Sequence, residues 1–176
     1  MLTWLLVIVA SVAVDQLTKR LAVACLMEKG SVEVIPGVLR FTYVENDGAA
    51  FGMLSEHRWI FMVISTVAIV AMLVYLWKFR PDNSWACTGI SLIIGGGIGN
   101  MIDRVYLDYV IDFIDFCAFP NLWMWVFNVA DACVCVGAGI LCVWCVVSLI
   151  QETRTAKKAK EPSDVKEGSD ETNETI

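Results

Sequence analysis

Three aspartates stand at the boundaries of long apolar segments. Asp112 and Asp115 follow one such segment, and Asp131 lies in the first turns of the next. Ionisable side chains beside membrane-length segments are costly, so they are candidates for function. Two carboxylates held close in a poorly hydrated site cannot both stay ionised, and such a pair shares one proton. The pair can take a proton from water while it donates one to a carbonyl oxygen, as peptide hydrolysis requires.

Amide and guanidinium side chains lie close to these carboxylates in the sequence. Asn100 and Arg104 are four residues apart, and Asn128 precedes Asp131 by three, so each pair shares a helix face where the helix persists. These side chains could hold a peptide backbone or orient the carboxylates. The glycine-rich run at 95–99 would admit either a neighbouring helix or a bound peptide.

Other chemistries remain open for the same carboxylates. Paired carboxylates inside a membrane also serve as proton or cation relays in transporters. A metal site or a serine or cysteine nucleophile is disfavoured, because the single histidine, His57, is far from the aspartates in sequence and no cluster has zinc-ligand spacing. Asp115, three residues after Asp112, competes with it for a role in catalysis.

The elements that must hold these residues are membrane spans. The chain has 176 residues, 57% of them hydrophobic, and its mean hydropathy is +0.64. These values are typical of a membrane protein, and no basic patch indicates nucleic-acid binding. Apolar segments at 3–27, 59–77, 85–102 and 125–150 predict four transmembrane helices. The predicted fold class is therefore an all-α membrane protein.

The connections and the tail complete this prediction. Residues 28–58 turn at Pro36-Gly37 and alternate apolar and polar side chains nearby, which predicts a small extracytoplasmic β-sheet and loop between the first two helices. Residues 105–125 are too acidic to span and are interpreted as a connection. We expect a four-helix transmembrane domain over 1–152 and a disordered cytoplasmic tail over 153–176.

Basic residues predict how the chain crosses the membrane. Lys78 and Arg80 occupy a short loop, and four more basic residues begin the tail, whereas the longer connections are richer in acid. Both termini are therefore expected in the cytoplasm. The third helix then leaves the membrane where the fourth enters it. Asp112 and Asp131 are expected to share one depth, at the outer boundary of the bilayer.

Five motifs occur in order along these spans. They are Asp15–Lys19, Asn46–Phe51, Gly96–Arg104, Val110–Phe113 and Phe127–Asp131. Together they resemble the lipoprotein signal peptidases (signal peptidase II), which are polytopic aspartyl proteases of the bacterial cytoplasmic membrane. The resemblance covers about residues 10–150 and departs from the family before the fourth motif, where this chain has Asp108-Tyr109 in place of the usual glycine.

The resemblance implies a role for each matching residue. It implies that Asp112 and Asp131 form the catalytic dyad, which decides against Asp115. Asp15 and Lys19, which share a helix face four residues apart, fall on positions that support the structure. Positions that line the family's substrate pocket are occupied by Asn46, Gly96, Asn100, Arg104 and Asn128.

The resemblance also implies a reaction and a location. The family removes the signal peptide from prolipoproteins that carry diacylglycerol on the future N-terminal cysteine, and it cuts just before that cysteine. Two aspartates activate water by general acid/base catalysis, without a cofactor or a metal. We therefore expect a monomeric aspartic endopeptidase in the inner membrane, with its site near the extracytoplasmic face and lipid-modified precursors and membrane lipid as partners.

Overall fold

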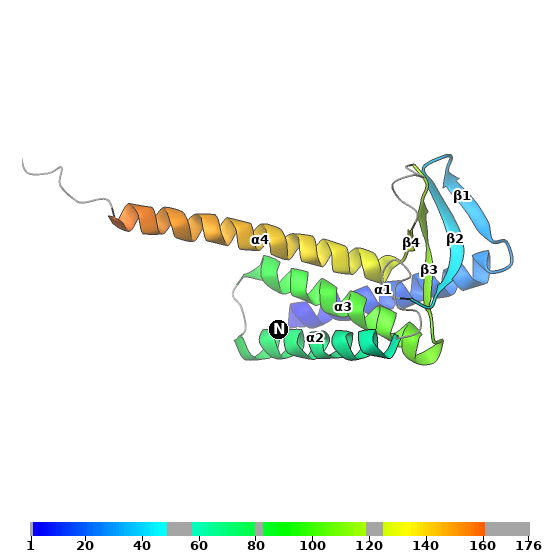
Figure 1. Cartoon of the computed structure of the whole chain (residues 1–176), viewed down its shortest axis with the longest axis horizontal. Helices are drawn as coiled ribbons and strands as arrows, with labels where there is room; N and C mark the ends of the chain where they lie inside the picture. The colour runs from blue at the N-terminus through cyan, green and yellow to red at the C-terminus, as the bar shows by residue number, and fades with distance from the viewer. Residues whose placement is uncertain (1, 49–57, 80–82, 119–124, 161–176) are drawn as a thin grey trace, which may run out of the picture. The chain divides into compact units, whose positions relative to one another are not determined.

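The computed structural model describes residues 2–48, 58–79, 83–118 and 125–160 (Figure 1). Its elements are, in chain order, α1 (Leu2–Leu26), β1 (Ser31–Ile35), β2 (Leu39–Asn46), α2 (Arg58–Phe79), α3 (Ser84–Tyr106), β3 (Val110–Phe116), β4 (Val126–Phe127) and α4 (Val129–Lys160). Within these residues, four helices are long and apolar enough to cross a membrane. The prediction of a four-helix membrane protein is confirmed.

The helices place apolar side chains outward and charged ones inward, which suits lipid surroundings. Leu6 of α1, Val67 of α2 and Val136 of α4 are more than half exposed, whereas Asp15 and Lys19 of α1 are buried. A charged side chain is costly in hydrocarbon, so it faces the interior of the bundle and finds partners there. The interior of the bundle is therefore where the polar groups gather.

The glycine-rich run of α3 lets this helix lie close to α1 and to α4. A Cβ added at Gly95 would lie 2.6 Å from Cβ of Ser11 on α1. A Cβ added at Gly96 would collide with the backbone carbonyl of Ala130 on α4. Small residues allow such backbone approach between membrane helices. In this structure the space beside Gly96 is filled by α4.

The sheet is antiparallel, with strand order β1-β2-β3-β4. The expected sheet between α1 and α2 is present as the β1–β2 hairpin, but the sheet also takes β3 and β4 from the connection between α3 and α4. That connection was predicted only to be too acidic to span the membrane, with no strand assigned to it. Val110–Phe116 reads VIDFIDF, and such short β-branched and aromatic runs form strands.

The sheet lies across the C-terminal end of α1 (Figure 1). Ala22 and Leu26 of α1 pack with Phe113 of β3 in a buried apolar cluster, and Phe41 of β2 contacts the Phe113 ring edge-on, with ring centroids 6.0 Å apart. Burying aromatic side chains against a helix end stabilises the sheet, which is too small to form a core alone. This contact fixes β3 relative to α1.

The ends of α4 differ from the expected ones. The helix begins at Val129 rather than near Trp125, because Val126 and Phe127 pair with β3 instead. It continues to Lys160, past residue 152, through residues that favour helix. Residues 161–176, the acidic part of the expected tail, lie outside the described residues. So do Arg80 and residues 49–57, which include His57 and the end of the second motif.

Candidate active site

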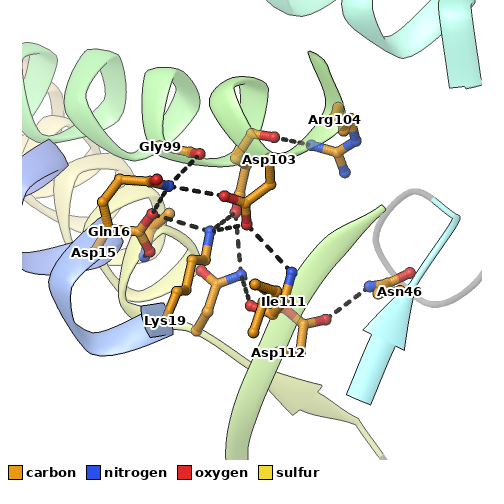
Figure 2. Close-up of polar contacts among 12 residues, drawn as sticks. Asp15, Gln16, Lys19, Asn46, Gly99, Asp103, Arg104, Ile111 and Asp112 are labelled. Carbon is orange, nitrogen blue, oxygen red and sulfur yellow. Dashed lines mark hydrogen bonds and ion pairs between the residues drawn. The ribbon is translucent and has the colours of Figure 1, made fainter. Parts of the chain in front are cut away.

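Asp112 lies on β3 and is 2% exposed. Its Oδ1 accepts a 2.6 Å hydrogen bond from Nδ2 of Asn128, and its Oδ2 accepts a 2.8 Å bond from Nδ2 of Asn46 (Figure 2). The register of β2 and β3 explains the second contact, because Asn46 stands opposite Val110, two residues from Asp112. Both carboxylate oxygens are therefore held by amide donors from different elements.

Asp131 lies in the first turn of α4, and it is hydrogen-bonded to Asn128, the residue immediately before this helix. The backbone N–H of Asn128 donates to Oδ2 of Asp131 over 3.2 Å, and the backbone N–H of Asp131 donates to Oδ1 of Asn128 over 2.9 Å. This is the reciprocal geometry of a capping box, with asparagine and aspartate in the usual positions of serine and glutamate. The start of α4 therefore fixes the Asp131 carboxylate.

Asn100 and Asn128 join the two aspartates. Nδ2 of Asn100 donates to Oδ1 of Asp131 over 2.8 Å, and Nδ2 of Asn128 donates to Oδ1 of Asn100 over 3.0 Å as well as to Asp112. Asn128 is fully buried. A continuous amide bridge therefore connects Asp112, on the sheet, with Asp131, on the last helix.

Burial raises the pKa of Asp112 to about 6. The charge of Asp131 raises this pKa further, whereas hydrogen bonds from Asn46 and Asn128 and the charge of Lys19 lower it. The Asp112 carboxyl therefore exchanges a proton at mildly acidic pH.

Arg104 reaches toward this site from the last turns of α3. Its guanidinium makes two 3.4 Å contacts, donating to the carbonyl oxygens of Asn100 and Gly48. The side chain is half-buried. A guanidinium has five N–H donors, so Arg104 has others with which to bind a carbonyl or carboxylate.

Asp15 and Lys19 form the expected ion pair, with 2.9 Å between Nζ and Oδ2. Lys19 also pairs with Asp103 of α3 over 2.8 Å, and Asp15 accepts a 2.9 Å bond from the backbone N–H of Ala130. Gln16 donates to Asp103 over 2.8 Å. The sequence favoured only an ion pair or a helix cap for Asp103 and assigned no role to Gln16, although Asp103 follows Asn100 by three residues and so shares its helix face.

Asp115 lies outside the amide bridge. It stands opposite Arg40 in the β2–β3 register and accepts a 2.6 Å hydrogen bond from Nε of Arg40. Thr42 contacts the same carboxylate oxygen at 3.4 Å. Over the described ranges, no group of three or more His, Cys, Asp or Glu side chains is arranged to hold a metal ion.

Comparisons with known proteins place this chain in a family. The family model described as signal peptidase (SPase) II matches residues 7–147. A lipoprotein signal peptidase of Caldanaerobacter subterraneus subsp. tengcongensis is 50% identical over 137 residues, which cover 77% of this chain and 91% of the relative. A lipoprotein signal peptidase of Clostridioides difficile is 40% identical over 141 residues, which cover 80% and 93%.

Two solved structures of bacterial membrane enzymes have the same fold. One, obtained by the in meso method at 2.3 Å resolution, has a TM-score of 0.74 and 32% identity and covers 94% of this chain and 96% of the other. The second, obtained at 1.9 Å, has a TM-score of 0.72 and 35% identity and covers 81% and 92%. The helices, the sheet and the sequence thus agree: this chain is a bacterial membrane protein and belongs to the signal peptidase II family of proteases.

Proposed function

We propose that this protein is an aspartic endopeptidase that removes the signal peptide from diacylglyceryl-modified prolipoproteins and cuts just before the lipidated cysteine. The observation that carries the proposal is the amide bridge from Asp112 to Asp131 through Asn128 and Asn100. Such a bridge can hold two carboxylates on either side of one peptide bond. The relatives named lipoprotein signal peptidases supply the substrate class.

In the proposed reaction the two aspartates divide the proton transfers. Asp131 takes a proton from water, whose oxygen attacks the scissile carbonyl, while Asp112 donates its proton to the carbonyl oxygen. When the C–N bond breaks, Asp131 gives its proton to the leaving nitrogen and Asp112 recovers one from a hydroxyl group. Buried Asp112, whose pKa is about 6, suits the donor role, and half-buried Asp131 suits the contact with water.

We assign the remaining polar side chains to substrate binding. Asn46, Asn100 and Asn128 surround the carboxylates and would orient the peptide against them. Arg104 would hold a carbonyl of the substrate with its remaining donors. Gly96 would contribute to the pocket wall by letting α3 and α4 meet closely.

We further propose an orientation in the membrane. Lys78 lies in the last turn of α2, and Arg154 and Lys157 lie near the end of α4. Basic residues favour the cytoplasmic side, which puts both termini there and the aspartates near the extracytoplasmic face. A diacylglyceryl anchor would deliver the scissile bond to this same boundary of the bilayer. Residues 1–152 would act as the catalytic unit, as a monomer.

One assay tests the proposal. The purified protein is incubated with a diacylglyceryl-modified precursor, with the same precursor lacking the lipid, and with the modified precursor plus a chelator. We expect a shortened product from the modified precursor alone and with chelator, and none from the unmodified one. No product from the modified precursor, together with ion flux across sealed vesicles, would support a carboxylate relay instead.

A further inference from the structure

Lys19 is a buried cation whose donors are all used. It is 1% exposed, and its Nζ lies 2.9 Å from Oδ2 of Asp15, 2.8 Å from Oδ2 of Asp103 and 2.9 Å from Oδ1 of Asn100. An ammonium group has three N–H donors, so these three oxygens satisfy it. One of them belongs to the amide bridge between the aspartates. Lys19 therefore does more than neutralise a neighbour on α1.

The contact with Lys19 sets the orientation of the Asn100 amide. Because Lys19 and Asn128 both donate to Oδ1 of Asn100, its Nδ2 must face the other way, where it donates to Asp131. Turning the amide over would place its NH₂ group against two donors and its oxygen against a carboxylate. An unpaired donor or acceptor in a buried site is costly. The cation thus selects the orientation that Asp131 needs.

Asp103 contacts the other part of the site, the backbone of β3 next to Asp112. Its Oδ2 accepts a 3.2 Å hydrogen bond from the backbone N–H of Ile111, the residue immediately before Asp112 (Figure 2). Its Oδ1 accepts from Gln16, and the carboxylate pairs with Lys19. Asp103 is 3% exposed. This side chain therefore ties β3, at the position of Asp112, to both α1 and α3.

We propose that Lys19 and Asp103 form a positioning unit that holds the Asn100 amide beside Asp131 and the β3 backbone beside Asp112. The inference rests on the proposed function, because it assigns these residues to the geometry of that dyad. Neither residue contacts the reacting atoms. They act through Asn100 and Ile111.

The charges of Lys19 and Asp103 should shift the pKa of Asp112 in opposite directions, which a merely structural role would not do. Lys19 lowers the pKa of Asp112, so losing its charge raises that pKa. Losing the negative charge of Asp103 lowers the pKa, because a nearby anion disfavours ionisation. Charged groups on the helices around Asp112 include Lys19 and Asp15 of α1, Asp103 and Arg104 of α3, and Asp131 of α4. On the strands they include the exposed Glu45 of β2, which accepts from Tyr43, and the ion pair of Arg40 on β2 with Asp115 on β3.

The test compares Lys19→Met with Asp103→Asn in the full-length protein on the diacylglyceryl-modified precursor. We expect Lys19→Met to lower kcat by about 10- to 100-fold with little change in KM, because the dyad is displaced rather than the substrate lost. The alkaline limb of its kcat/KM profile moves to higher pH. Asp103→Asn keeps an acceptor for Ile111 and the Lys19–Asp15 pair, and its alkaline limb moves to lower pH.

A double variant separates charge from orientation. Lys19→Met with Asp103→Asn removes one positive and one negative charge, so its alkaline limb returns toward that of the native protein. Its kcat stays low, because Asn100 has lost its hydrogen bond from Lys19 and keeps only the one from Asn128 on the same oxygen. The control is Ile94→Ala, a fully buried apolar residue of α3 outside the network. It lowers the melting temperature while the pH profile and kcat of the folded enzyme stay native.

The outcomes separate this inference from the proposed function. Native protein that cleaves nothing contradicts the proposed function itself. A second outcome overturns the positioning unit alone. In it the native protein cleaves the precursor, but the alkaline limbs of the kcat/KM profiles of Lys19→Met and Asp103→Asn stay in place or move in the same direction. If Lys19→Met does not fold, Asp103→Asn decides: a limb at lower pH supports the inference, and an unmoved limb overturns it.

Discussion

The side chain of Asn128 donates a hydrogen bond of 2.6 Å to Oδ1 of Asp112. The same residue donates its backbone N–H to Asp131 and accepts from that residue in return. A single buried asparagine thus contacts both carboxylates. Both carboxylates are therefore in contact with the residue that caps α4.

Replacing this asparagine should disturb both carboxylates. In Asn128→Ala, Asp112 loses a hydrogen bond that lowers its pKa, so the pKa rises and the alkaline limb of kcat/KM moves to higher pH. The loss of buried hydrogen bonds should lower the free energy of unfolding by about 1–3 kcal/mol. The measurements are a pH profile of cleavage and thermal unfolding in detergent.

The matched control for that variant is Asn83→Ala. Asn83 caps α3 by accepting from the backbone N–H of Ala86, away from the carboxylates. Its loss should cost about 0.5–2 kcal/mol of stability and leave the pH profile native. An unshifted profile in Asn128→Ala would show that Asn128 serves only as a helix cap.

The native enzyme should lose activity on the alkaline side as Asp112 loses its proton. The pKa of this carboxyl is raised to about 6, and the proposed reaction needs it protonated, so kcat/KM falls as the pH rises through that region. A profile of kcat/KM on the modified precursor from pH 4 to 9 measures this. Activity that only increases up to pH 9 would contradict the donor role of Asp112.

A side chain at Gly96 should force two helices apart. In Gly96→Ala the new methyl group collides with the carbonyl of Ala130 on α4, whose first turn holds Asp131. Such overpacking should cost about 1–3 kcal/mol, and cleavage should slow because Asp131 moves from Asn100. Gly139→Ala is the control, since a Cβ there meets nothing within 4 Å. Equal behaviour of the two variants would exclude a packing role for Gly96.

The turn between α3 and β3 depends on an unusual backbone conformation. Asp108 has φ +73°, in the left-handed region that glycine, asparagine and aspartate adopt most readily. Asp108→Val should lower the free energy of unfolding by about 1–2 kcal/mol, because a branched side chain is strained there. Asp108→Gly should be free of this backbone strain, because glycine adopts the left-handed region readily. Thermal unfolding compares the two, and equal melting temperatures would mean that the turn relaxes.

The helices were predictable because membrane spans have a strong local signal. Uncharged runs such as that of α2 need about twenty apolar residues to cross a bilayer, and no tertiary information is required to find them. β3 was missed because the acidic residues of 105–125 were used only to exclude a membrane span there. β4 has only two residues, Val126 and Phe127, so only pairing with β3 reveals it.

The candidate site was predictable only in part, because several of its contacts depend on tertiary packing. The carboxylates and amides were identified from their residue types and from their places at the ends of apolar segments. The spacing of Asn128 and Asp131 predicted one shared helix face, and the two residues are in contact. The bond between Lys19 and Asn100 joins residues 81 positions apart, and that between Ile111 and Asp103 uses a backbone group. Neither leaves a pattern in a single sequence. Both depend on how α1, α3 and β3 pack.

The most direct test of the account is cleavage of a diacylglyceryl-modified precursor by Asp112→Asn, Asp131→Asn and Asp115→Asn, each purified and checked for native unfolding behaviour. Losing a general acid or base should reduce kcat by about 10²- to 10⁴-fold in the first two variants. Asp115, paired with Arg40 outside the amide bridge, should be dispensable. Native rates in folded Asp112→Asn or Asp131→Asn, or a comparable loss in Asp115→Asn, would contradict the assignment of the dyad.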